Sequence, residues 1–178
     1  YIRGNKQADP YGQLPIPDSI VTVAEMMKQA GYTTGMFGKW GLGVENSIGD
    51  PQKQGFDEFY GYYCQLMAHN SFPPYLYHNG QKEMLQNEVV WSHKDDWTRG
   101  LGSYSTKKIE YSNDLFFSHA IEFIEKNQAT PFFLYLPVTI PHSNGEAPAG
   151  EKNEVPTFAP YQNENWSREQ KAYAAQIT

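Results

Sequence analysis

Residues Gly31 to Gly43 read Gly-Tyr-Thr-Thr-Gly-Met-Phe-Gly-Lys-Trp-Gly-Leu-Gly, and this segment is the most informative part of the 178-residue chain. Gly31 follows an apolar stripe with helical spacing, at the place where a helix needs a residue in the left-handed conformation to end. Thr22 and Glu25 have the spacing of a capping box, so we expect the helix to begin at Thr22. Residues 32–38 mix β-branched and aromatic side chains, which predicts a short buried strand.

Lys39 comes directly after this predicted strand, at its carboxyl end. Open α/β sheets bind ligands at the carboxyl ends of their strands, and the glycines at 38, 41 and 43 would let a ligand approach the backbone closely. From these residues alone, an ordinary surface lysine is the favoured interpretation of Lys39.

A second helix and a second strand are expected further along the chain. Apolar residues recur on one side of 112–127, which predicts an amphipathic helix. After Pro131, the apolar run 132–138 predicts a fully buried strand. Helices that alternate with strands and long loops indicate an α/β fold with its chemistry on the loops.

The remaining segments predict a hairpin, a short strand and long loops. Asn79-Gly80 separates two alternating runs within 75–85, which is a strong signal for a β-hairpin. Residues 88–91 are expected to form another short strand. Residues 41–74 and 139–166 are rich in glycine, proline or polar residues and predict long loops at the carboxyl edge of the sheet.

Composition limits the possible partners. The formal charge of −6 argues against nucleic acid, so any anion site must be a local basic pocket. No apolar run is long enough to span a membrane. Cys64 is the single cysteine and cannot form an internal disulfide, so it does not constrain the redox compartment. The 13 Tyr, 10 Phe and 4 Trp residues favour aromatic packing in the core, and some of them would suit a sugar-binding cleft.

Three ordered segments resemble motifs of the sulfatase family. Gly31 to Gly43 resembles its signature G-Y-x-T-x-x-x-G-K-W-H-x-G, and Gln54 to Gly61 resembles its G-F-D-x-F-x-G segment. Pro131 to Pro137, followed by Pro141-His142, is similar to its core strand and P-H motif. The resemblance implies an alkaline-phosphatase-like α/β fold with a mostly parallel or mixed sheet flanked by helices. It also implies that residues 1–178 are an internal portion of a single catalytic domain.

The resemblance implies catalytic and sulfate-binding roles for Lys39 and His142. A compact ammonium group and an imidazole suit a tetrahedral anion, because both can donate charge-assisted hydrogen bonds to its oxygens. The family pattern has His after the Trp, but here that position is Gly41, so one expected contact is missing. His69 lies in the loop that borders the substrate pocket in the family and is a candidate to replace it in substrate binding; a solvated or structural histidine is the alternative. Three other histidines are expected to be structural, namely His78, His93 and His119.

Calcium and a formylglycine nucleophile are also implied by the resemblance. The family makes formylglycine from Cys or Ser in a C/S-x-P/A-x-R motif, which the sequence around Cys64 does not match. Asp95-Asp96 is expected to be a solvated turn and Asn113-Asp114 the first turn of a helix. We therefore assign no metal ligand and no nucleophile within these 178 residues, and expect both to lie outside them.

The function implied is hydrolysis of a sulfuric ester of a sugar or an aryl compound, in a secreted, periplasmic or lysosomal enzyme. Because the nucleophile and calcium ligands are expected elsewhere, we expect the 178 residues alone to be inactive. The alternatives are a non-catalytic carbohydrate-binding module and a sulfatase-like pseudo-enzyme, for which Gly41 is the local hint. An Asp-Asp pair and a C/S-x-P/A-x-R motif in sequence preceding Tyr1 would favour catalysis.

Overall fold

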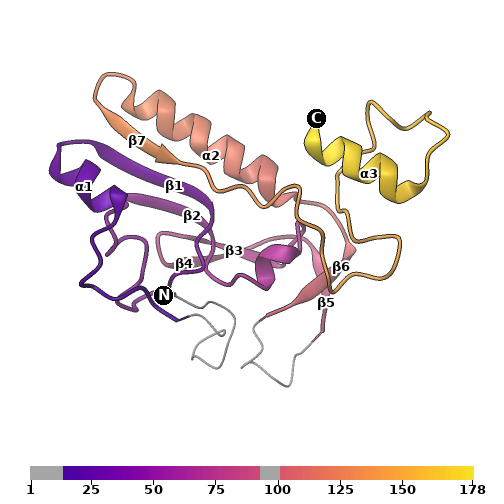
Figure 1. Ribbon diagram of the computed structural model, residues 1–178, viewed down its shortest axis with the longest axis horizontal. Helices are drawn as coiled ribbons and strands as arrows, with labels where there is room; N and C mark the ends of the chain where they lie inside the picture. The colour runs from indigo at the N-terminus through magenta and orange to yellow at the C-terminus, as the bar shows by residue number, and fades with distance from the viewer. Residues whose placement is uncertain (1–13, 93–100) are drawn as a thin grey trace.

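The computed structural model describes residues 14–92 and 101–178 (Figure 1). These residues form a five-stranded sheet with the order β4-β3-β2-β1-β7 and a two-stranded sheet of β5 and β6, together with three α-helices. In chain order the elements are α1 (Val23–Gln29), β1 (Thr33–Lys39), β2 (Glu58–Tyr62), the 3-10 helix η1 (Met67–His69), β3 (Tyr75–His78), β4 (Gln81–Met84), β5 (Glu88–Trp91), β6 (Ser103–Lys107), α2 (Ser112–Asn127), β7 (Phe132–Tyr135) and α3 (Arg168–Ile177).

The predicted first helix and strand are confirmed. Thr22 Oγ1 accepts a hydrogen bond from the Glu25 amide at 3.2 Å, and Glu25 Oε2 accepts one from the Thr22 amide at 2.7 Å, which completes the capping box. Gly31 follows the helix with φ of 86°, a left-handed conformation that suits glycine. β1 then extends through Lys39, so the lysine is the last residue of the strand.

β1 lies between two parallel neighbours, β2 and β7. Gly35 pairs with Glu58 of β2, and Thr33 pairs with Phe132 of β7. The carboxyl ends of all three strands therefore meet at one edge. β3 adds to β2 in the antiparallel direction and makes the sheet mixed, so the predicted fold class is confirmed.

The prediction of uninterrupted loops over 41–74 is wrong, because β2 lies inside this segment. The side chains of Phe59, Tyr60 and Tyr62 are all buried, so the strand is covered on both faces and shows no polar–apolar alternation. Gly61 also marks a close approach of two backbones: a Cβ at this position would overlap the carbonyl oxygen of Gly38 in β1.

The strand predicted over 132–138 is shorter and less buried than expected. β7 ends at Tyr135, and its side chains are half-buried or exposed, with Tyr135 at 45%. The reason is its position at the edge of the five-stranded sheet, where β1 covers only one of its sides. Phe133 and Tyr135 stack against the ring of Phe56.

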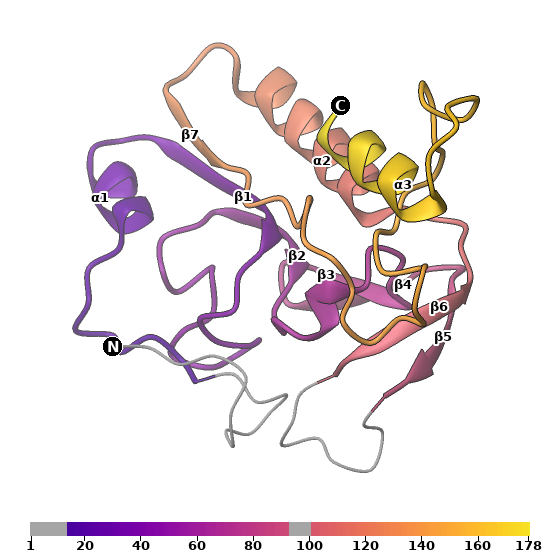
Figure 2. The same ribbon diagram turned by 45° about the vertical axis from the view of Figure 1, so that its right-hand side comes forward.

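The predicted second helix, α2, packs on the face of the sheet opposite α1 (Figure 2). Phe116 and Phe123 of α2 are buried, and a Cβ on Gly35 would lie 2.8 Å from the Phe123 ring, so glycine lets the helix approach β1 closely. His119 stacks on Tyr60 with 3.8 Å between ring centroids, and burial lowers the pKa of this histidine. This packing fits the structural role expected for His119.

The hairpin of β3 and β4 is confirmed, with Asn79 and Gly80 at φ of 48° and 81° in its turn. The strand β5 is also confirmed. Its partner β6 was not predicted, because its sequence Ser-Tyr-Ser-Thr-Lys is short and polar. Residues 139–166 form the predicted long loop, and α3 begins after Ser167, whose side chain caps it.

Candidate functional site

Lys39 ends β1 at the carboxyl edge of the sheet, and its side chain is half-buried. Its backbone amide donates to the carbonyl of Pro137 at 3.0 Å, so β1 stays paired with the chain beyond β7. That chain continues directly to His142. The parallel strands thus bring Lys39 and the segment carrying His142 to the same edge, as the sequence predicts.

His142 is exposed and lies in a turn that begins after Thr139, whose carbonyl accepts from the His142 amide at 3.0 Å. The ring atom Nδ1 lies 2.8 Å from the carbonyl oxygen of Ser143. A carbonyl oxygen can only accept, so Nδ1 carries the proton. Nε2 is therefore the ring nitrogen left for a ligand.

His69 stacks on His142, with 4.7 Å between ring centroids and 17° between ring planes. His69 ends the short helix η1 in the chain that follows β2, whereas His142 follows β7. Nδ1 of His69 lies 3.0 Å from Oε2 of Glu146, and the two side chains are only 21% and 14% exposed. Two histidines that are distant in sequence thus form one cluster with a carboxylate, and Glu146 is the member that the sequence did not predict.

A buried polar network holds the two histidine segments together. The side-chain amides of Asn70 and Asn144 donate to Ser103 of β6, to its hydroxyl and its carbonyl respectively, both at 3.0 Å. Asn70 is adjacent to His69 and Asn144 lies two residues after His142. All three residues of the network are fully buried. Buried polar groups satisfied in this way fix the relative position of the segments that carry them.

Glu154 extends this network from the loop that follows His142. Its Oε2 accepts from the backbone amide of Ser71 at 2.8 Å and from Nδ2 of Asn144 at 3.3 Å, and its Oε1 lies 3.4 Å from Nζ of Lys108. Burial raises the pKa of the Glu154 carboxyl, although these donors favour its ionised form.

Gly41, which replaces the histidine of the family pattern, has φ of 74°. A Cβ at this position would lie 2.6 Å from both Cγ and Nε2 of Gln65. The Gln65 side chain therefore fills the space that a side chain at 41 would enter, and its Nε2 donates to the Gly41 carbonyl at a long 3.4 Å. Sequence reasoning missed Gln65, although it is in the same short segment as His69.

The described residues do not fit a metal centre. Within 14–92 and 101–178, no three His, Cys, Asp or Glu side chains gather closely enough to hold a metal ion. Asn113 lies in the first turn of α2, as predicted, and accepts from the Thr139 amide at 3.2 Å. His93 and Asp95-Asp96 lie outside the described residues. Burial raises the pKa of the Cys64 thiol, which does not favour a thiolate nucleophile.

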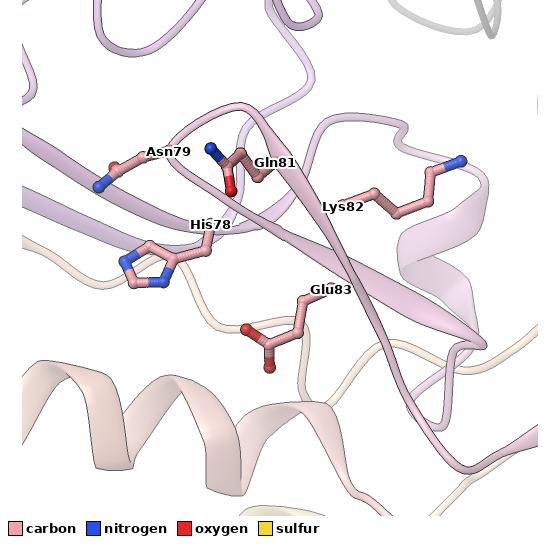
Figure 3. Close-up of a pocket in the computed structure, with 5 residues that line it drawn as sticks. All are labelled: His78, Asn79, Gln81, Lys82 and Glu83. Atoms are coloured by element: carbon pink, nitrogen blue, oxygen red, sulfur yellow. The ribbon is translucent and has the colours of Figure 1, made fainter.

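A separate hollow of about 420 Å³ lies beside the hairpin of β3 and β4 (Figure 3). The turn residue Asn79 bonds to Phe59 near the start of β2, whereas Lys39 pairs with Tyr62 at its end, so the turn of the hairpin lies toward the opposite end of the strands from Lys39. In Figure 3 Lys82 extends away from His78 and Glu83, so the lining side chains do not converge on one point. This geometry favours the structural role expected for His78.

None of the helices within 14–92 and 101–178 combines the length and apolar composition needed to cross a membrane.

Comparison with known proteins agrees with the geometry. The family model described as Sulfatase matches residues 3–178. An arylsulfatase of Hemicentrotus pulcherrimus is 36% identical over 153 residues, which cover 76% of this chain and 24% of that protein. N-acetylgalactosamine-6-sulfatase of Homo sapiens is 33% identical over 137 residues, covering 72% and 23%.

A solved structure shares the fold over almost the whole chain. The structure of Ps i-CgsB in complex with k-i-k-neocarrahexaose matches with a TM-score of 0.62 and 22% identity, covering 98% of this chain and 36% of that one. The chain spans about a quarter of the length of the curated relatives named above, at 24% and 23%. With a family match along nearly its entire length, the chain belongs to the sulfatase family.

Proposed function

We propose that the complete protein hydrolyses sulfuric esters, and that this chain is an internal portion of its single catalytic domain that supplies part of the sulfate pocket. The observation that carries the proposal is the stacking of His69 on His142, with 4.7 Å between their centroids, at the sheet edge where β1 ends in Lys39. Three basic groups at one edge of an acidic protein are suited to an anion.

Each basic side chain has its own proposed role. Lys39 supplies a compact positive charge to the sulfate oxygens, where negative charge must be stabilised while the sulfur–oxygen bond breaks. His142 directs Nε2 toward the substrate, because Nδ1 is bound to the Ser143 carbonyl. When protonated, His142 or His69 can donate a proton to the oxygen of the leaving alcohol. His69 would thereby replace the imidazole missing at Gly41.

We propose that calcium and formylglycine are held by residues of the complete protein that lie outside this chain. The family resemblance implies both, but the described residues gather no metal ligands and Cys64 lies in no matching motif. We therefore assign neither group to a residue of this chain.

The substrate class that we propose is a sulfated carbohydrate. Relatives named N-acetylgalactosamine-6-sulfatase support this choice, and the relative named arylsulfatase makes an aryl sulfate the second candidate. By the same resemblance we propose a secreted, periplasmic or lysosomal location. A carbohydrate-binding module or a pseudo-enzyme is the competing function.

Sulfate release by the complete protein tests the proposal. The protein is incubated with sulfated N-acetylgalactosamine saccharides and with nitrophenyl sulfate, and free sulfate is measured by ion chromatography. We expect release from at least one substrate, and a loss of about a hundredfold or more in His142→Ala, the typical contribution of a proton-transfer group. His78→Ala, in the β3–β4 hairpin and outside the stacked histidine pair, is the matched control. Binding of the sulfated saccharide without any release of sulfate would support the competing function instead.

A further inference from the structure

The carboxylate of Glu146 is the acidic group of the histidine cluster. We propose that Glu146 is a positioning residue that fixes the tautomer and the ring orientation of His69 for substrate. This inference rests on the proposed function, because it concerns the same sulfate pocket. Its basis is the 3.0 Å contact between Glu146 Oε2 and His69 Nδ1, which joins two largely buried side chains.

The contact dictates where the protons of His69 lie. An ionised carboxylate only accepts hydrogen bonds, so Nδ1 of His69 must be the donor. His142 is fixed in the same way by the carbonyl of Ser143 at 2.8 Å. Both rings therefore use Nδ1 to bind the protein and keep Nε2 for a ligand.

The stacking of the two rings makes the orientation of His69 important. Their centroids lie 4.7 Å apart with 17° between the ring planes, so the ring that Glu146 holds through Nδ1 also packs on His142. Fixing His69 therefore also fixes the surface against which the His142 ring lies.

Glu146 is itself held rigidly. Its backbone amide donates to Oδ1 of Asn144 at 3.1 Å, and the side chain of Asn144 is anchored on Ser103. Gly102, next to Ser103, leaves room for the carboxylate, because a Cβ there would lie 3.0 Å from Cγ of Glu146. The turn thus presents the carboxylate to His69 from a buried support, as a positioning residue requires.

Three variants of the complete protein test the role. Glu146→Gln keeps an oxygen that accepts from Nδ1 but removes the charge, and Glu146→Ala removes both. Glu151→Gln, an exposed glutamate in the same loop, is the control. The measurements are nitrogen-15 spectra of labelled histidines, which report the tautomer of His69, and kcat/KM for sulfate release.

We expect Glu146→Ala to lose the Nδ1–H tautomer of His69 and about tenfold to a hundredfold in kcat/KM, the range for loss of a carboxylate that orients a functional imidazole. Glu146→Gln should keep the tautomer and lose less activity than Glu146→Ala, because its amide oxygen still accepts from Nδ1. The Glu151→Gln control should match the wild type. A His69 tautomer unchanged in Glu146→Ala, or a kcat/KM in Glu146→Gln as low as in Glu146→Ala, overturns the inference. The spectra need no turnover, so they test Glu146 even if the wild type releases no sulfate and the proposed function fails.

Discussion

Asn70 and Asn144 bind the same residue, Ser103, through their side-chain amides at 3.0 Å each. One asparagine accompanies His69 and the other accompanies His142 and Glu146. The spacing between the two histidine segments is therefore set by a strand of the small β5–β6 sheet, and not by the strands that carry the segments to the edge.

Asn144→Ala should destabilise the complete protein by about 1–3 kcal/mol, since it removes hydrogen bonds from largely buried partners. The partners are the Ser103 carbonyl, one oxygen of Glu154 and the backbone amide of Glu146. Urea unfolding measures the change, and kcat/KM should fall as well because the turn loses its anchor. Asn165→Ala, at an exposed position, should change neither quantity. If Asn144→Ala and Asn165→Ala have the same free energy of unfolding and the same kcat/KM, the supporting role of Asn144 is refuted.

Lys39→Ala should slow sulfate release about a hundredfold or more, or on the order of 3 kcal/mol, because it removes a preorganised donor from a site of developing charge. Lys39→Arg should restore little, since a planar guanidinium does not replace a compact ammonium. Lys107→Ala, on an exposed side chain of β6, serves as the control. Near-normal turnover by folded Lys39→Ala would make Lys39 an ordinary surface lysine.

Gly41→Ala should lower the free energy of unfolding by about 1–2 kcal/mol, the cost of a left-handed conformation for an L-residue. The new Cβ would also meet the Gln65 side chain. Adding Gln65→Ala should relieve that contact but not the backbone cost. The matched control is Gly145→Ala, where a Cβ would meet nothing within 4 Å. If thermal unfolding finds both glycine variants equally stable, the backbone explanation for Gly41 is wrong.

Glu154→Gln should change how stability depends on pH. Burial raises the folded-state pKa of this carboxyl above its ordinary value of 4.5, so the folded state holds its proton more tightly than the unfolded state does. Between those two pKa values the wild type loses stability as pH rises. The glutamine variant lacks this titration, so its stability relative to the wild type should increase as the pH rises above the ordinary pKa of 4.5. Urea unfolding at several pH values should show that the free energy of unfolding of Glu151→Gln differs from that of the wild type by the same amount at every pH. If the difference for Glu154→Gln is also independent of pH, this account is contradicted.

The α/β framework could be predicted because its signals are local. The capping box at Thr22, the left-handed Gly31 and the Asn79-Gly80 turn each act within a few residues, and all three are present in the structure. β2 and β6 were missed for opposite reasons. β2 is buried on both faces and β6 is polar, so neither shows the alternation that identifies a half-buried strand.

The candidate site was only partly predictable. Motif resemblance selected Lys39, His69 and His142, and strand order brings the segments that carry them to one edge. Glu146 and Gln65 could not be found in this way, because their importance depends on contacts with residues far away in the chain. Ser103 could not be found either, because nothing in the sequence around it indicates that this buried residue anchors two loops.

The contact between His69 and Glu146 closes 77 residues of chain, and the one between Ser71 and Glu154 closes 83. Closing such long loops costs conformational entropy. This cost is offset only after the intervening strands have docked, so contacts of this kind form late in folding. The histidine cluster cannot exist in a partly assembled chain. A sulfated ligand that binds this cluster would bind only the folded state and would therefore stabilise the whole domain against unfolding.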